Sequence, residues 1–514
     1  MCGKFESAGP SDQYVRLTRG ASYLVMRNLG LNAVTVLGFA IIARLISTKE
    51  MGVWSVLFLV NVTCEEFALA IPQAVTKFVA ENAASGMRSL AVGAFFQGSR
   101  IILAIFAPLA VSIYLGASFL ATHLLGDGSY ATLFRILAVD VFFYAGMLPT
   151  LKAALLGLKM FREISVVDLC VGGFFRQLLV IALIVLMKGF VGLVIGWVIS
   201  DMTIVVIYFG LATRALSPPK FNFPVSKLFR FSLPLTFADI VNYAQASFDR
   251  IVLLVFVPLS TFGIYNASLA AFGALLGISS ALSSMLYSAY SSIQEKTGTG
   301  SGMRGAVRLA SRYSSFTLTP LAFGLLATAK PALTLFVGES YVDGYVPLII
   351  FSGAFALTAA FESLKPALLA LGKTDVYAPI TAVSVSIGLV AAYVLLPVWG
   401  IVGASTARAL AMILLAVLTV LVLGRKIALT VDFRSIARNL FAGVVMAAVI
   451  LMVQIVAYNK FLLPLYVLIG AIVYLVILRL LKAVNAADLD ILRGFLGVRL
   501  SFASSILGWI LAPD

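Results

Sequence analysis

Polar residues recur inside residues 231–293, a stretch whose first half is apolar enough to span a bilayer. Asp239, Asn242, Gln245 and Asp249 follow one another at spacings of three, three and four residues. On an α-helix this spacing places the four side chains on one face. A polar face inside a membrane span normally faces the protein interior or a water-filled cavity. Its donors and acceptors suit sugar hydroxyls, so the stripe is a candidate cavity lining. Hydrogen bonding between neighbouring helices is the alternative.

Nothing in the sequence has the pattern of a catalytic or metal site. Cys2, Cys64 and Cys170 form neither a disulfide framework nor a metal motif, and His123 is the only histidine. There is no phosphate-binding loop or nucleophile elbow. We therefore predict a protein that is not an enzyme and that has no cofactor or resident metal.

Composition places the chain in the membrane. Hydrophobic residues make up 61% and charged residues 11% of the 514 residues, whereas soluble domains carry about 25% charged residues. Mean hydropathy is +1.06. Apolar runs of roughly 20 residues recur from end to end, long enough for helical spans. The start of the chain lacks the pattern of a cleaved signal peptide, so we expect the first span to be retained. The predicted fold class is an all-α polytopic membrane protein.

We predict fourteen transmembrane helices. They lie near residues 22–46, 53–78, 90–120, 130–155, 165–187, 190–213, 230–257, 262–292, 306–328, 345–371, 375–396, 401–423, 436–458 and 461–481.

The distribution of the 37 basic residues predicts the orientation. With the N-terminus inside, 26 fall in inner segments and four in outer loops, which are Lys49, Lys188, Lys330 and Lys460. The positive-inside rule then places both termini in the cytoplasm and the protein in the cell membrane. The net charge of +15 is explained by contact with anionic lipid headgroups, so we expect no nucleic-acid partner.

Three short motifs recur at a nearly constant offset. Gly52–Ser55 reappears as Gly263–Asn266, Leu151–Leu156 as Leu364–Leu369, and Gly189–Gly192 as Gly400–Gly403, at offsets of 211, 213 and 211 residues. Six spans are therefore repeated in the same orientation. Parallel repeats are a transporter architecture in which the substrate site lies between the halves and alternating access moves the substrate.

The repeat predicts four regions. Residues 1–215 form an N-terminal six-helix lobe and residues 216–428 a second lobe that repeats it. Residues 429–484 form two additional spans, which could line a groove for a lipid tail. Residues 485–514 form an amphipathic tail at the membrane surface.

Charged residues deep inside spans are costly unless they are paired or hydrated. Glu65 and Glu66 lie about 18 Å into the second span at 1.5 Å per residue. Adjacent acids point about 100° apart on a helix and are hard to pair together. We predict that they serve ion coupling, by exchanging a proton or by holding Na⁺ with Asn61 and Thr63.

Other buried charges have two interpretations. Asp140, Arg176 and Asp201 lie at comparable depth and could form an internal ion pair or line a cavity. The same pair of interpretations covers Glu362 and Arg408.

Arginine is the only base inside the spans, and it could bind a phosphate-bearing substrate. Arg27 and Arg44 lie near opposite ends of the first span. They could reach the membrane surface along their stems, or bind the phosphates of a pyrophosphate-linked glycolipid. Arg250 could bind substrate or pair locally with Asp249.

Several of these segments resemble one protein family. Ala43-Arg44-Leu45-Ile46 with Lys49–Trp54, Gln73–Glu81, and Asp249-Arg250 with Gly263-Ile264-Tyr265 are similar to signatures of Wzx-type polysaccharide-biosynthesis flippases. These belong to the multidrug/oligosaccharidyl-lipid/polysaccharide exporter superfamily. The resemblance implies a V-shaped bundle that moves a lipid-linked oligosaccharide from the inner to the outer leaflet. Its partners would be that substrate, membrane lipids and glycan-assembly enzymes.

Two other functions stay open. One is a cation-coupled multidrug or metabolite exporter of the same superfamily, which usually needs only twelve spans. The other is a non-transporting scaffold of a glycan-assembly complex, whose internal charges should all be paired and whose cavity should be closed.

Overall fold

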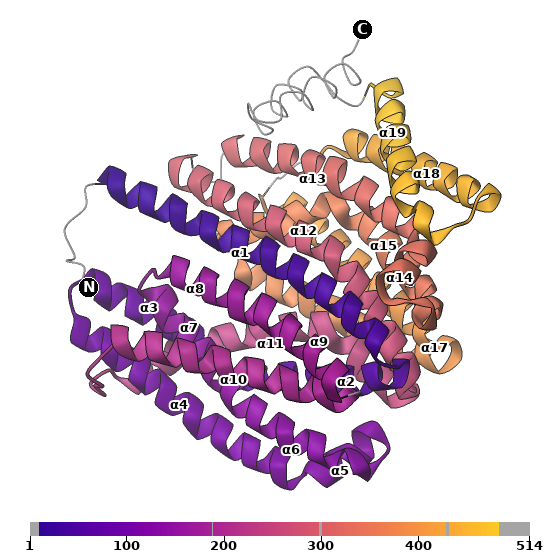
Figure 1. Ribbon diagram of the computed structural model, residues 1–514. Helices are drawn as coiled ribbons and strands as arrows, with labels where there is room; N and C mark the ends of the chain where they lie inside the picture. The colour runs from indigo at the N-terminus through magenta and orange to yellow at the C-terminus, as the bar shows by residue number, and fades with distance from the viewer. Residues whose placement is uncertain (1–9, 188, 298–300, 428–430, 483–514) are drawn as a thin grey trace. The chain divides into compact units, whose positions relative to one another are not determined.

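The computed structural model describes residues 10–187, 189–297, 301–427 and 431–482 (Figure 1). Every regular element among these residues is a helix. The predicted amphipathic tail, residues 485–514, lies outside the described residues. Chain contacts divide the protein into two compact units, residues 1–246 and residues 247–514, here called unit 1 and unit 2. The four predicted regions remain a prediction.

The helices of unit 1 run in order along the chain. They are α1 (Pro10–Leu45), α2 (Thr48–Glu65), η1 (Glu66–Ala68), α3 (Ile71–Ala84), α4 (Arg88–Leu115), α5 (Ala117–Leu125), η2 (Gly128–Tyr130), α6 (Ala131–Asp140), η3 (Val141–Met147), α7 (Leu148–Gly157), α8 (Phe161–Val167), η4 (Asp168–Phe175), α9 (Arg176–Met187) and α10 (Phe190–Ala215). α1 packs on α8, η4 and α9, while α3 packs on α4 and α7. α11 (Val225–Phe256) begins in unit 1 and continues into unit 2.

Unit 2 contains the longest helices. They are α12 (Leu259–Thr297), α13 (Ser301–Ala327), α14 (Ala329–Val337), η5 (Glu339–Gly344), α15 (Tyr345–Thr358), η6 (Ala359–Ser363), α16 (Leu364–Ala370), α17 (Thr374–Ile427), α18 (Phe433–Val456), η7 (Lys460–Leu462) and α19 (Leu463–Leu480). α13 packs on α12, α15 and α18, and α18 packs on α19. The two additional spans are thus part of the unit 2 helix packing.

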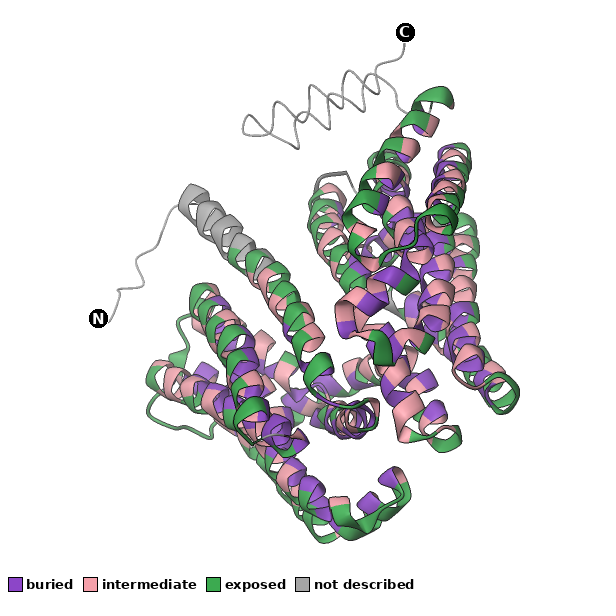
Figure 2. Cartoon of the chain, turned by 45° about the vertical axis from the view of Figure 1, so that its right-hand side comes forward, coloured by how far each residue is buried: buried purple, intermediate pink, exposed green. Residues whose placement is uncertain are grey.

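Apolar side chains cover the outside of these helices. Ile455 and Val456 at the end of α18 are 84% and 88% exposed, and Leu115 at the end of α4 is 77% exposed. Buried and exposed residues alternate around the helices (Figure 2). Exposed apolar faces of this extent are stable against lipid rather than water, so this is a multi-pass membrane protein.

The number of spans agrees closely with the sequence prediction. Among the described residues, eleven helical segments are long and apolar enough to cross a membrane, and twelve if the bent pair α13–α14 counts as one. α11 is not among them because its polar stripe lowers its hydropathy. Residues 375–425 count as one segment although the backbone of Gly400 is not helical (φ 53°, ψ −129°). The count of fourteen, which needs α11 and two crossings in α17, remains a prediction.

Corresponding glycines make the two tight turns of the repeat. Gly192 follows the turn before α10, and Gly403 follows the break at Gly400 in α17. A side chain at Gly192 would collide with the carbonyl oxygen of Leu183, and one at Gly403 with that of Leu395. Glycine is required at both because the returning helix approaches the preceding one too closely for a Cβ atom. This is the physical basis of the third repeated motif.

The second predicted span, residues 53–78, is not one continuous helix. α2 ends at Glu65 and α3 begins at Ile71. Between them, Leu69 and Ala70 both adopt left-handed backbone conformations, with φ of 51° and 49°. Pro72 contributes to the break because it has no backbone N–H to donate to a preceding turn. Left-handed non-glycine residues are strained and are often found at functional sites.

Candidate functional site

Two basic side chains in unit 1 are held side by side by one buried carboxylate. Asp168, the first residue of η4, forms ion pairs with Arg27 Nη1 on α1 at 3.1 Å and with Lys152 Nζ on α7 at 2.8 Å. The hydroxyl of Tyr208 on α10 donates to Asp168 Oδ1 at 2.8 Å. We call these four residues the Asp168 cluster. Its two cations and one anion leave a formal charge of +1.

The cations of this cluster remain accessible while its anion does not. The side chains of Arg27 and Lys152 are 22% and 28% exposed, and that of Asp168 is 4% exposed. Arg27 also bonds Asn28 Oδ1 through Nε and Nη2, which fixes the guanidinium plane. A half-buried, oriented guanidinium beside an ammonium group suits the binding of phosphate.

Acidic residues gather at the break between α2 and α3. Glu65 is exposed and Glu66 is half-buried. Glu66 lies within electrostatic range of Asp239 on α11, whose Oδ2 accepts from Gln73 Nε2 of α3 at 3.0 Å. Glu65 lies within electrostatic range of Lys152. The predicted ion-coupling acids therefore lie beside part of the predicted cavity stripe, and near the Asp168 cluster.

A second, deeper cluster in unit 1 contains three predicted charges. Arg176 on α9 forms an ion pair with Asp201 on α10. Asp140, the last residue of α6, accepts a hydrogen bond from Asn61 Nδ2 of α2. All four side chains are buried. We call these four residues the Asp140 cluster. The ion pair between Arg176 and Asp201 matches one of the two interpretations given for these charges, an internal ion pair rather than a cavity lining.

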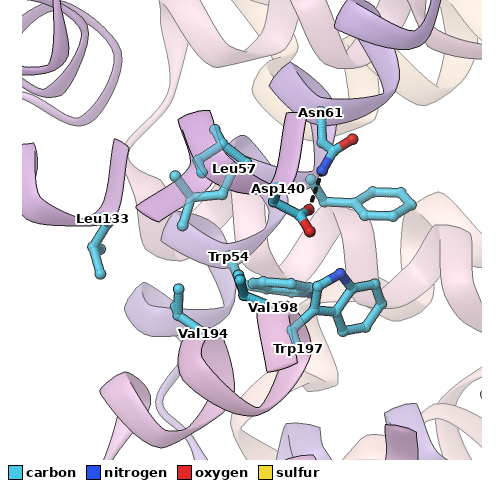
Figure 3. Close-up of a pocket in the computed structure, with 10 residues that line it drawn as sticks. Trp54, Leu57, Asn61, Leu133, Asp140, Val194, Trp197 and Val198 are labelled. Atoms are coloured by element: carbon cyan, nitrogen blue, oxygen red, sulfur yellow. Dashed lines mark hydrogen bonds between the residues drawn. The ribbon is translucent and has the colours of Figure 1, made fainter. Parts of the chain in front are cut away.

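A small cavity adjoins the Asp140 cluster. Its lining includes Asn61, Asp140, Trp54 and Trp197. In Figure 3, Asp140 and Asn61 face one another and the two indole rings lie to one side of them. The rings make an edge contact with centroids 4.6 Å apart. The cavity measures ≈ 20 Å³, enough for about one water molecule.

In unit 2 a buried carboxylate is fully occupied. Asp249 of α11 pairs with Arg408 Nη1 of α17 at 2.6 Å and accepts a hydrogen bond from the hydroxyl of Tyr265 on α12. Asp249 is 0% exposed. Elsewhere in unit 2, Glu362 of η6 accepts a hydrogen bond from Ser279 Oγ at 2.8 Å.

The remaining predicted site residues are dispersed. Arg44 is exposed in the last turn of α1, 17 residues from Arg27 and so roughly 26 Å away along the helix. Asn242 is exposed and Gln245 half-buried in α11. Arg250 donates to Ser247 Oγ at 2.9 Å. The structure thus brings Asp239, Glu65 and Glu66 together in unit 1 and leaves Arg44 at the end of its helix.

Sequence reasoning missed three of the four members of the Asp168 cluster, which are Lys152, Asp168 and Tyr208. Lys152 was assigned to an inner segment, and Asp168 lies so near the start of its predicted span that it was not counted as a buried charge. The available signal was an acid inside a span that also holds an arginine, because such an acid needs a cationic partner. The distance in sequence between Asp168 and Arg27 gives no hint of which partner it takes.

In the described part of the chain, no three His, Cys, Asp or Glu side chains converge as metal ligands would.

Comparison with known families identifies one match. A family model described as polysaccharide biosynthesis protein matches residues 41–346, which is more than half of the chain. A comparison with curated proteins found no match.

Solved structures similar to this chain are membrane transporters. The lipid II flippase MurJ in an inward closed conformation has a TM-score of 0.74 at 13% identity, and the match covers 91% of this chain and 99% of that one. An inward-facing multidrug resistance MATE family transporter of the MOP superfamily has a TM-score of 0.62 at 13% identity, over 79% and 98% of the two chains. A mutant form of the MATE transporter VcmN of Vibrio cholerae has a TM-score of 0.56 at 16% identity, over 82% and 99%. At these identities the likeness shows the fold.

Proposed function

We propose that this protein, which belongs to the polysaccharide biosynthesis protein family, is a flippase for a lipid-linked oligosaccharide. It would move the headgroup of a polyprenyl phosphate or pyrophosphate glycolipid from the inner to the outer leaflet by alternating access. The product would supply surface polysaccharide or glycan assembly. The protein would bind and move this substrate without chemical change, so it would not act as an enzyme.

The Asp168 cluster is the observation that carries this proposal. Substrate phosphate could contact Arg27 and Lys152, which are oriented by Asp168 and remain partly exposed. The formal charge of +1 on the cluster would be neutralised by a singly charged phosphate. A dianionic pyrophosphate would leave the combined site with one negative charge, which water could solvate.

The position of the cluster fits uptake from the inner leaflet. Arg27 lies at the start of the apolar segment Met26–Leu45, and Lys152 lies near the end of the segment Gly128–Gly157. With the N-terminus in the cytoplasm, both ends face the inner surface of the cell membrane. The phosphate group of a glycolipid in the inner leaflet lies at this depth.

The stripe on α11 supports a sugar-binding role. Asp239, Asn242 and Gln245 are partly exposed, and their amide and carboxyl groups can accept from and donate to sugar hydroxyls. Asp249 has a different role in this account, because Arg408 and Tyr265 already occupy its carboxyl oxygens. Glycan-assembly enzymes would be the protein partners, since they deliver and consume such a substrate.

A cation-coupled multidrug exporter is the second candidate, supported by the likeness to MATE transporters. Reconstitution of the full chain into liposomes separates the two. We expect translocation of a fluorescent polyprenyl-pyrophosphate-linked oligosaccharide and no export of a cationic dye. Dye export without glycolipid movement would replace the flippase by an exporter. Movement of neither would favour the scaffold.

A further inference from the structure

The Asp140 cluster carries an excess of negative charge. Asp140 and Asp201 are 1% and 0% exposed, and Arg176 is 9% exposed. If both carboxyl groups were ionised, the cluster would hold a formal charge of −1 in the middle of an apolar helix bundle. An uncompensated buried charge is strongly unfavourable. Something must therefore neutralise it.

Two carboxyl oxygens of the Asp140 cluster have no hydrogen-bond partner among the described residues. Asp201 Oδ1 accepts from Arg176 and Asp140 Oδ2 accepts from Asn61. Asp140 Oδ1 and Asp201 Oδ2 are both buried and have no hydrogen-bond partner among the described residues. The two carboxyl groups also lie within electrostatic range of each other, so two ionised forms would repel one another. Ionised carboxylates can only accept hydrogen bonds, so two of them cannot bond each other unless one carries a proton.

We propose that Asp140 and Asp201 share one proton and form a proton-binding site inside unit 1. One carboxyl group then donates to the other, and the cluster becomes neutral with Arg176. A proton fits better than a metal cation. A metal cation would be repelled by the adjacent guanidinium and would find few oxygen ligands beyond those of Asp140, Asp201 and Asn61.

The helices around the site are built irregularly. Asp140 immediately precedes the π-helical segment η3, and Arg176 immediately follows the π-helical segment η4. π-helical segments are rare and are frequent at functional sites. The adjoining cavity, lined by Asn61 and Asp140, has room for about one water molecule that could pass the proton.

Few other charged groups of the described chain face the site. From η3, Tyr144 lies under the Arg176 guanidinium at 5.2 Å from ring to Cζ. Glu65 at the end of α2 lies within electrostatic range of Tyr144. α9 contributes Arg176 and α10 contributes Asp201. Because these groups come from four spans of unit 1, binding and release of one proton changes the net charge where the spans meet.

This inference goes beyond the proposed function. The proton site itself does not depend on the substrate, whereas its coupling to transport rests on the proposed function. It also differs from the sequence-based prediction that Glu65 and Glu66 serve ion coupling, because those acids lie at the helix break and not in the buried cluster.

Infrared difference spectroscopy on the purified full-length protein tests the site without any substrate. The wild-type protein at neutral pH should show a protonated-carboxyl band that titrates away at alkaline pH. Asp140→Asn and Asp201→Asn should each lose this band, since either substitution leaves one carboxylate to balance the charge of Arg176 and no need for a proton. Both variants remove charge without changing shape, so they should fold.

Glu81→Gln is the matched control. Glu81 is an exposed carboxylate on α3 that pairs only weakly with Lys77 at 3.8 Å, and its replacement should leave the band intact. A band that persists in both aspartate variants, or its absence from the wild type, would overturn the proposal. So would a band that is lost on adding Na⁺ at constant pH, which would assign a sodium site instead.

A transport measurement then tests the coupling separately. In liposomes, a proton gradient should accelerate glycolipid movement by the wild type and should have no effect on Asp140→Asn. Failure of all glycolipid movement would count against the proposed function and would leave the spectroscopic result standing. Equal acceleration of wild type and variant would overturn the coupling.

Discussion

The two units bury their charges in different ways. In unit 2 the Asp249 carboxylate is balanced by Arg408 and capped by Tyr265. In unit 1 the Asp140 cluster has two carboxyl groups for one guanidinium, with two carboxyl oxygens unpartnered among the described residues. The balanced group is built to hold helices together. The unbalanced cluster needs a further positive charge, which we propose is a proton.

The repeat makes this difference sharper. At the offset of 211, Tyr265 and Arg408 correspond to Trp54 and Trp197 of unit 1. Unit 2 therefore uses these two positions for a polar contact to Asp249, and unit 1 uses them for an aromatic pair beside a cavity. Corresponding positions of the two predicted repeats thus take part in a buried ion-pair contact in one unit and in a buried, charged site beside a small cavity in the other.

The largest effect should follow from breaking the balanced group. Arg408→Ala leaves Asp249 buried without its cation, so we expect a loss of roughly 3–5 kcal/mol in unfolding free energy. Thermal and denaturant unfolding in detergent measure it. Lys460→Ala is the control, because its pair with Glu339 is largely exposed and its loss should change the unfolding free energy far less. Equal stability of the two variants would show that Asp249 is not a structural charge.

A smaller effect should distinguish Lys152 from Lys365, the two lysines at corresponding positions of the repeat, in the rate of glycolipid translocation. Lys152 belongs to the Asp168 cluster, whereas Lys365 in unit 2 is exposed and lies 5.5 Å from the Tyr377 ring. Lys152→Ala should slow glycolipid translocation about 10- to 100-fold, the equivalent of one charge-assisted hydrogen bond of about 1.5–3 kcal/mol. We expect Lys365→Ala to change the rate less than about twofold. A similar loss in both variants would remove the distinction between the units.

The aromatic pair should matter less. Trp54→Phe keeps an aromatic ring but weakens the edge contact with Trp197, so we expect a loss of about 0.5–1.5 kcal/mol in unfolding free energy. Unfolding in detergent again provides the measurement. A loss above about 3 kcal/mol would mean that the pair stabilises unit 1 as strongly as the ion pair stabilises unit 2.

The smallest effect should come from the unbalanced cluster. Asp140→Asn replaces one carboxyl group of a proton-sharing pair by a neutral amide of the same shape and leaves Asp201 to balance Arg176. The net charge of the cluster does not change, so we expect unfolding free energy within about 1 kcal/mol of the wild type. Asp249→Asn is the matched change in unit 2 and should destabilise the protein, because it removes the anion of the buried ion pair with Arg408. If Asp140→Asn were the more damaging of the two, the charge accounting in unit 1 would be wrong.

Much of the fold follows from local sequence. Apolar runs predicted the helices. The repeated glycine motif marked the two tight turns, because Gly192 and Gly403 lie where a helix approaches the preceding one too closely for a Cβ atom. The break at Leu69 and Ala70 was not predicted, since neither residue type favours a left-handed backbone and only Pro72 hinted at it. The π-helical segments left no signal, because their residues are as apolar as those of an ordinary span.

The sites were harder to predict because their partners are distant in sequence. Arg176 and Asp201 are 25 residues apart on neighbouring spans, and that pairing was one of two interpretations. Asp249 and Arg408 are 159 residues apart. No periodicity connects such residues. The choice of partner is made by tertiary packing, which a single sequence does not encode in any local pattern.

Binding of a phosphate-bearing lipid to the Asp168 cluster tests the central claim most directly. Native mass spectrometry of the detergent-purified protein can compare polyprenyl pyrophosphate with the uncharged polyprenol of the same length. We predict a clear preference of the wild-type protein for the pyrophosphate, and loss of that preference in the Arg27→Ala/Lys152→Ala double variant. Equal binding of the two lipids by the wild type, or an unchanged preference in the double variant, would contradict the account.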